Sequence, residues 1–122
     1  MKSAVDWFEI PVEQLSRAVS FYEALLATRL KPSKYGPFEA AVFSVDDPGI
    51  GGALVQDKGR KAQQGGTRVY LCATGMLEEV LSRVAPAGGS VLLPKTDLGE
   101  PGYIAVIRDS EGNEVGLHSE RV

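Results

Sequence analysis

Hydrophobic and polar residues alternate at the start of the chain, from residue 4 to residue 12. Phe8 and Ile10 fall on one side of this segment and Trp7 on the other, which predicts a β-strand with one apolar face. From residue 13 to residue 26 the apolar positions recur at the three- and four-residue spacing of an amphipathic helix. The chain is therefore expected to begin with a strand followed by a helix.

Turn-forming residues divide the rest of the chain. Two prolines and a glycine over residues 31–37 predict an irregular segment, and the polar, glycine-containing residues 57–66 predict a loop. Alternation or helical spacing predicts the remaining elements: strands over residues 38–45, 50–56, 67–73, 90–94, 101–109 and 114–120, and a helix over residues 75–89.

The second half of the chain repeats the order of elements of the first half, which is strand, helix and then strands joined by tight turns. Three residues recur at a constant offset of 63 positions: Asp46 and Asp109, Gly49 and Gly112, Leu54 and Leu117. This self-similarity indicates an internal duplication of about 60 residues. We therefore divide one domain, residues 1–122, into modules over 1–57 and 66–122, joined by a linker over 58–65.

The composition is that of an ordinary globular domain, with 43% hydrophobic and 24% charged residues in a chain of 122. The net charge is −3 and the pI is about 5.1. Apart from a small cluster at Lys58, Arg60 and Lys61, the basic residues are scattered. Nucleic acids and anionic membranes require a basic patch, so we expect neither as a partner.

The single cysteine, Cys72, excludes an intrachain disulfide. It lies in the apolar run "VYLCA", which predicts a buried and inert thiol. The first ten residues contain no apolar segment typical of a signal peptide, and no apolar run approaches the length that spans a membrane. We therefore expect a cytoplasmic protein.

Three segments carry a resemblance to a known superfamily: "WFEIPVEQLSRAVSFYEALL" at residues 7–26, "GGTRVYLCA" at 65–73 and "GYIAVIRDSEGNEVGLHS" at 102–119. The chain resembles the vicinal oxygen chelate superfamily, which contains glyoxalase I, bleomycin-resistance proteins and extradiol dioxygenases. The resemblance implies an α+β fold of two tandem βαβββ modules, whose mixed sheets curl into an open barrel around one cavity. It also implies helices on the convex face and, commonly, a homodimer.

The resemblance implies positions for a divalent metal as well. Carried onto this sequence, the usual ligand positions fall on Trp7, on or near Arg68, and on Gly116. Tryptophan and glycine offer no ligating side-chain atom, and arginine stays protonated. We therefore expect no bound metal and no other cofactor.

Other residues on the cavity side of the strands are candidates for a rebuilt site. Glu9, Glu114 and His118 would share this face. However, Glu114 and His118 are four residues apart on one strand, roughly 13 Å, and cannot both bind one ion. We favour the interpretation of His118, the only histidine, as a strand-end residue over that of a ligand.

Glu9 and Gly116 each allow two interpretations. In an apolar cavity Glu9 would have a raised pKa and serve as a catalytic base or as an anchor for a cationic ligand; otherwise it is paired with an arginine. Gly116 either eases strand packing or opens the cavity floor. The Gly51-Gly52 pair marks either curvature of the barrel or close approach of a ligand. Tyr103 either lines the mouth of the cavity or packs at the start of its strand. Asp46 and Asp109 are expected to cap their turns.

The candidate ligand-binding residues are therefore Trp7, Glu9, Tyr103, Glu114, Gly116 and His118, with Glu9 as the candidate catalytic residue. The favoured function is a metal-free binding protein for a small organic molecule, as in bleomycin-resistance proteins. One alternative is a glyoxalase-like lyase, isomerase or dioxygenase, with a rebuilt metal site or acid–base chemistry at Glu9. Another is a ligand-sensing regulatory domain.

Overall fold

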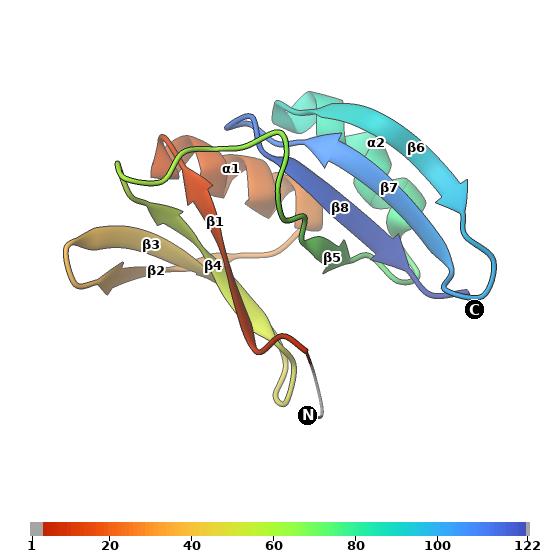
Figure 1. The fold of residues 1–122 in the computed structure, drawn as a ribbon, viewed down its shortest axis with the longest axis horizontal. Helices are drawn as coiled ribbons and strands as arrows, with labels where there is room; N and C mark the ends of the chain where they lie inside the picture. Colours follow the sequence, from red (N-terminus) through yellow and green to blue (C-terminus); the bar gives the residue numbers. More distant parts are fainter. Residues whose placement is uncertain (1–3, 122) are drawn as a thin grey trace.

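The computed structural model describes residues 4–121, so the outermost residues of the two expected modules, 1–3 and 122, lie outside the described part of the chain. Figure 1 shows the elements in chain order: β1 (Trp7–Val12), α1 (Leu15–Leu26), β2 (Leu30–Tyr35), β3 (Phe38–Phe43), β4 (Gly51–Gln56), β5 (Tyr70–Cys72), α2 (Leu77–Ala87), β6 (Ser90–Asp97), β7 (Tyr103–Arg108) and β8 (Glu114–Ser119).

Each half of the chain forms one βαβββ module with its own four-stranded mixed sheet. The strands lie in the order β1-β4-β3-β2 in the first sheet and β5-β8-β7-β6 in the second. The first and last strands of each module pair in parallel, and all other neighbours are antiparallel. The two sheets do not close, so the expected α+β fold, an open and curled barrel of two modules, is confirmed.

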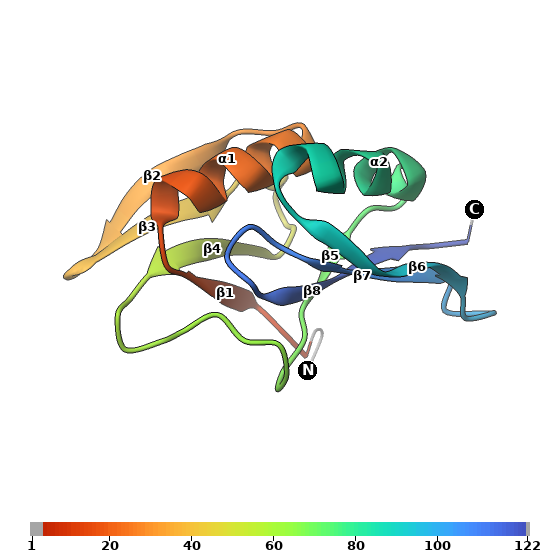
Figure 2. The same ribbon diagram turned by 90° about the horizontal axis from the view of Figure 1, so that it is seen from above.

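The helices and the connecting segment lie on opposite sides of the sheets. Figure 2 shows α1 and α2 together on one side, while the segment between β4 and β5 crosses the other side. The helices contain 12 and 11 residues. Within residues 4–121, neither helix is long and apolar enough to cross a membrane.

The segment 31–37, predicted to be irregular, contains most of β2, so that prediction was wrong. β2 pairs only with β3 and lies at the edge of its sheet. A proline at an edge removes no hydrogen bond that the sheet requires, and Pro32 is exposed there. β6, the edge of the second sheet, likewise runs past Pro94, with register irregularities between Val91 and Thr96.

The helices and the inner faces of both sheets enclose the main core. Alternation along β1 and β8 places Ile10, Val115 and Leu117 in it, each at most 3% exposed. Phe8 is partly buried and packs against Phe43, with ring centroids 5.6 Å apart. Because these residues face the helices as predicted, the alternate residues of the same strands face the opposite side.

Buried polar groups join the turn between β7 and β8 to the first module. Asp109 is 3% exposed and accepts a hydrogen bond from the Tyr22 hydroxyl at 2.7 Å. It also accepts from the backbone N–H groups of Glu111 and Asn113, at 2.8 and 2.9 Å. The side-chain amide of Asn113 donates to the Pro11 carbonyl oxygen at 2.9 Å. Asp109 therefore caps its turn, as predicted, and also holds α1 of the other module.

Helix α1 begins without a capping side chain of its own. The N–H of Leu15, its first residue, donates to the side-chain oxygen of Gln56 at 2.7 Å. Just before the helix, Glu111 of the second module accepts from the backbone of Glu13 at 3.1 Å and of Gln14 at 2.9 Å. The same carboxylate binds the Arg17 guanidinium at two points, 2.7 and 2.9 Å. A fully buried carboxylate thus supplies negative charge at a helix N-terminus, where it stabilises, and links the two modules.

The corresponding turn of the first module, at residues 46–49, differs from its repeat. Here the backbone N–H of Gly49 donates to the carbonyl oxygen of Asp46 at 2.5 Å. Within residues 4–121 the Asp46 side chain makes no hydrogen bond, so the prediction that Asp46 caps its turn was wrong. The turn is exposed and is closed by this backbone hydrogen bond.

Replacement of Glu111 by glutamine should lower the free energy of unfolding and make it less dependent on pH in the acid range. Burial raises the pKa of Glu111, but hydrogen bonds from Arg17, the Gln14 backbone and Ser110 outweigh this effect, and the pKa lies below its ordinary value of 4.5. A carboxyl whose pKa is lowered by folding contributes stability above pH 4.5, and this contribution is lost as the pH falls through the folded-state pKa. At pH 7 we expect Glu111→Gln to cost about 1–3 kcal/mol.

Urea unfolding of both proteins between pH 7 and pH 3 measures this effect. The difference between wild type and Glu111→Gln should shrink below pH 4.5. The exposed Glu79, at the start of α2, supplies the control variant Glu79→Gln, which should keep the wild-type slope. Parallel stability curves for wild type and Glu111→Gln would contradict the assignment.

Candidate functional site

A hollow of about 760 Å³ opens where the start of β1 meets β5, between the two modules. Six large hydrophobic side chains that line it are exposed to solvent: Val5, Trp7, Val45, Ile50, Tyr70 and Met76. We call this hollow the apolar cleft. Trp7 and Tyr70 are each 42% exposed, and an aromatic ring so exposed is available to stack on a ligand.

Aromatic rings lie over glycines in both parallel strand pairs. Tyr70 pairs with Gly116 and Phe8 with Gly52 across the strands. A side chain at Gly116 would collide with the Tyr70 ring, and one at Gly52 would lie 2.5 Å from the Phe8 ring. Of the two interpretations of Gly116, the structure therefore supports packing, since the Tyr70 ring fills the space that the glycine leaves. The glycine of β8 fixes Tyr70 at the wall of the cleft.

One charged side chain, Arg68, lines the apolar cleft within the described residues. Its guanidinium donates to the Tyr70 hydroxyl at 3.5 Å and to Glu114 at 3.1 Å. The hydrogen bond to Tyr70, followed by that to Glu114, raises the pKa of Arg68 above its ordinary value. The guanidinium is 40% exposed and stays charged, so the cleft combines an apolar wall with one positive group.

A second hollow, also about 760 Å³, lies between the linker and strands β1 and β8. Glu9 lines it and pairs with Arg60 of the linker at 2.7 Å. Arg60 also binds Asp57 at 3.2 Å, and Gln63 is held by the side-chain oxygen of Asn113 at 3.1 Å. Glu9 is exposed rather than buried among apolar groups, so the arginine-paired interpretation of this residue is the one the structure supports.

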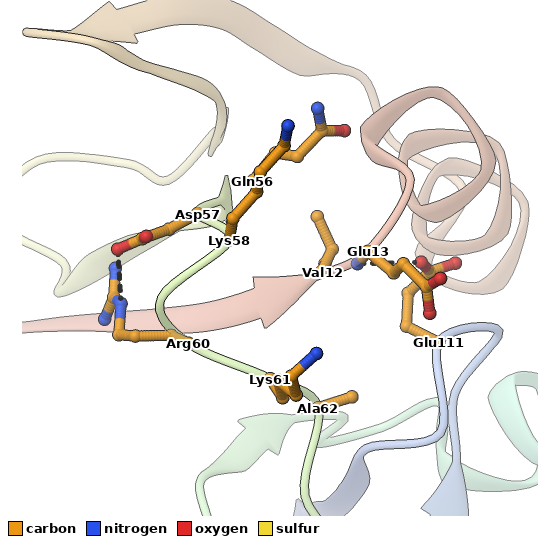
Figure 3. Close-up of a pocket in the computed structure, with 9 residues that line it drawn as sticks. All are labelled: Val12, Glu13, Gln56, Asp57, Lys58, Arg60, Lys61, Ala62 and Glu111. Carbon is orange, nitrogen blue, oxygen red and sulfur yellow. Dashed lines mark hydrogen bonds and ion pairs between the residues drawn. The ribbon is translucent and has the colours of Figure 1, made fainter.

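The third hollow, about 580 Å³, lies near the start of α1 and is polar (Figure 3). Its lining contains Lys58, Arg60 and Lys61 together with acidic groups of equal number, Glu13, Asp57 and Glu111. In Figure 3 dashed lines join Arg60 to Asp57 and the Glu13 backbone to Glu111. The lining of this hollow is mostly charged, whereas organic ligands favour a largely apolar wall, so the apolar cleft offers the better surface for an organic molecule.

His118, two residues after Gly116 on β8, and Tyr103 lie outside the three hollows. His118 donates from Nε2 to the Pro101 carbonyl oxygen at 2.6 Å, and this partner fixes the proton on Nε2. Tyr103 is packed against the core, with the Lys95 ammonium 4.5 Å and the Arg121 guanidinium 4.6 Å from its ring centre. Neither residue lines any of the three hollows. The strand-end interpretation of His118 and the packing interpretation of Tyr103 therefore agree with the structure.

Cys72 is exposed and lines the apolar cleft, so the prediction of a buried thiol was wrong. β5 has only three residues, and Leu71 between Tyr70 and Cys72 is the one that faces the core. Alternation on this strand places the thiol on the solvent side, although its neighbours in the sequence are apolar.

The family model for the Glyoxalase/Bleomycin resistance protein/Dioxygenase superfamily matches residues 4–117. The chain belongs to this superfamily. The matched range covers most of both modules and every residue that lines the apolar cleft. Among curated proteins, none matches this chain.

Solved structures support the same fold. A glyoxalase/bleomycin resistance/dioxygenase domain from Frankia sp. superposes with a TM-score of 0.72 at 20% identity, over 98% of each chain. A glyoxalase family protein from Bacillus cereus gives 0.71 at 21% identity, over 97% of this chain and 94% of its own. A glyoxalase I variant from Zea mays gives 0.70 at 22% identity, over 93% of this chain and 44% of its own. At these identities the likeness concerns the fold alone.

The residues at the superfamily's usual metal positions do not fit a metal ion. Trp7 presents an indole ring, and Arg68 presents a cation that is already bonded to Glu114. Gly116 lies under the Tyr70 ring. Within residues 4–121 no group of three or more histidine, cysteine, aspartate or glutamate side chains is placed to hold an ion. Divalent metals require several such donors at one point, so no chemical step is derived through a metal.

The sequence identified Trp7 at the cleft but missed most of its wall. Val45 and Ile50 flank the first-module turn and are exposed, although apolar residues of a strand pattern are expected to be buried. Arg68 drew attention only as a residue that cannot bind metal. The signal that could have revealed it is the 63-residue offset of the repeat, which relates Trp7 to Tyr70 and Val5 to Arg68. All four residues line the cleft.

Replacement of Gly116 by alanine should destabilise the protein by displacing Tyr70. The new methyl group would occupy the space of the ring, and overpacking of this kind costs about 1–3 kcal/mol. In a Tyr70→Ala background the same replacement should cost less than about 1 kcal/mol, because the conflict is gone. Chemical denaturation of the four proteins gives the coupling. Gly65, which has open space around it, provides the control variant Gly65→Ala. Equal costs in both backgrounds would show that Tyr70 does not depend on Gly116.

Proposed function

We propose that this protein binds a small aromatic organic molecule in the apolar cleft without the help of a metal. The observation that supports the proposal is the gathering of six exposed hydrophobic side chains around one hollow. Exposed apolar patches in a soluble domain mark binding surfaces, and a concave one of this volume suits a drug-sized molecule. The superfamily contains bleomycin-resistance proteins, which gives this reading a precedent.

Trp7 and Tyr70 favour a flat ligand. Each ring presents a face or an edge to the cleft, and stacked aromatic pairs gain about 0.5–1.5 kcal/mol beyond the burial of their area. Tyr70 is held over Gly116 and bonded to Arg68, so little conformational freedom is lost when a ligand binds. These features support a binding site that is already formed before the ligand binds.

The geometry gives less support to an enzyme that uses Glu9 as a base. Glu9 is exposed and bonded to Arg60 at 2.7 Å, and it lines the hollow under the linker rather than the apolar cleft. A general base needs a free carboxylate within hydrogen-bond reach of its substrate. We therefore propose binding, for sequestration or for sensing, as the function of the cleft.

Trp7 is the only tryptophan in the chain, so its fluorescence reports directly on the cleft. A panel of bicyclic aromatic compounds, both neutral and charged, should include members that quench Trp7 and raise the melting temperature. Trp7→Ala should weaken binding, measured by calorimetry, by about 1.5 kcal/mol, or roughly ten-fold. Phe38 is exposed but lies outside the cleft, so Phe38→Ala should bind as wild type does.

Two results would count against this function. One is a panel in which no compound both quenches Trp7 and stabilises the fold. The other is unchanged affinity in a well-folded Trp7→Ala protein. Elemental analysis of protein purified without chelator tests the metal-free part of the proposal separately, and stoichiometric zinc, iron, nickel or manganese would overturn that part.

The proposal includes a homodimer, because β6 leaves an apolar edge uncovered. Its residues Val91, Leu92 and Leu93 are 38–42% exposed, and bare edge strands of this kind favour association with another strand. Light scattering at micromolar concentration should give twice the chain mass of 13.0 kDa. Leu92→Lys should shift the protein toward monomer, whereas Phe38→Lys on the other sheet should not. A monomeric wild type would refute the dimer.

A further inference from the structure

Arg68 gives the apolar cleft a positive charge. Within the described residues that line the cleft, Arg68 is the one with a full charge at neutral pH, and no carboxylate is among them. Glu114, its ionic partner, lines the neighbouring hollow under the linker instead. A molecule in the cleft therefore meets aromatic and aliphatic groups and one guanidinium.

The guanidinium retains free hydrogen-bonding capacity. It makes one contact with Glu114 at 3.1 Å and one long contact with the Tyr70 hydroxyl at 3.5 Å. A guanidinium carries five N–H donors in a fork that matches a carboxylate, so further donors are available. The side chain is 40% exposed, which leaves it accessible from the cleft.

Ligand binding changes the environment of this charge. A molecule that fills the cleft removes water from the N–H donors of Arg68 that Glu114 and Tyr70 leave free, and burial of donors without a partner is costly. A neutral ring leaves that cost unrelieved, and a cationic ligand adds repulsion. A carboxylate meets the guanidinium with charge-assisted hydrogen bonds, which are about twice as strong as neutral ones.

The aromatic and the charged groups of the cleft come from both modules. Trp7 stands at the start of β1 beside Gly51, the first residue of β4. In the second module Arg68 lies two residues before Tyr70 and binds Glu114, the first residue of β8. Trp7 and Tyr70 are 63 residues apart, the offset of the repeat, so each module offers a ring and the second module adds the guanidinium of Arg68.

We infer that the ligand of the apolar cleft is an aromatic carboxylate, with its ring against Trp7 and Tyr70 and its carboxylate on Arg68. This inference rests on the proposed function and adds the chemical class of the ligand. Arg68 is then the residue that determines specificity between acidic and neutral aromatic molecules of the same shape.

The test compares 2-naphthoate with 2-naphthamide, which have the same ring and nearly the same shape but differ in charge. Quenching of Trp7 and calorimetry measure both dissociation constants at low salt and at pH 7. We expect naphthoate to bind at least about ten-fold more tightly than naphthamide, and the difference to shrink as salt is added.

Three variants assign the preference to Arg68. Arg68→Gln should bind both compounds with about the affinity that wild type shows for naphthamide, while Arg68→Lys should keep part of the preference for naphthoate. Glu114→Gln removes the carboxylate that competes for the guanidinium, so it should strengthen binding of naphthoate and leave naphthamide unchanged. A residue with a purely structural role would not produce this selective gain. Melting curves establish that each variant is folded.

The outcomes separate the inference from the proposed function. If both compounds bind equally to wild type, the cleft binds aromatic molecules but the inference is wrong. If the preference for naphthoate persists in folded Arg68→Gln, the inference is also wrong, because another group supplies the positive charge. If neither compound binds, this ligand class is excluded, and the wider panel of bicyclic compounds decides whether the proposed function fails as well.

Discussion

The buried carboxylates of the β7–β8 turn hold the two halves of this protein together. Asp109 binds the Tyr22 hydroxyl, and Glu111 binds both Arg17 and the start of α1. Burial raises the pKa of Tyr22 well above its ordinary value, and the nearby charge of Asp109 adds to this effect, so the hydroxyl remains a donor at neutral pH. Removal of one member of such a network leaves a buried polar group without a partner, which costs more than the bond itself contributed.

The apolar cleft lies between the two modules that these buried carboxylates join. The two sheets share no strand pairing, and the cleft opens in the gap between β1 and β5. α1 and α2 also pack together on the helical side (Figure 2), so the gap is closed there and open on the other side. Glycines on neighbouring strands leave the space that aromatic rings at its wall occupy. The positions of these rings therefore depend on the backbone rather than on mobile side chains.

Period-two and helical patterns predicted both helices, most strands and the side of each strand that faces the core. They failed at β2, where Pro32 was taken for a break, because the sequence does not say that this strand lies at an edge. They failed at Cys72, because a run of apolar letters does not show which of them point inward on a three-residue strand. An arginine partner was one of the two interpretations of Glu9, but the sequence did not show which arginine it is. Arg60 reaches Glu9 because the linker folds back over β1, which local spacing does not encode.

The unequal turns of the two modules also bear on how the protein can change. The turn at residues 109–113 is bonded to the other half, so an inserted residue there would break the buried network. The turn at residues 46–49 closes on its own backbone, and Val45 and Ile50 on either side of it border the apolar cleft. Surface turns tolerate insertions at small entropic cost. Length variation at this single turn would therefore reshape the mouth of the cleft while leaving the rest of the scaffold intact, which gives new ligand preferences an accessible evolutionary route.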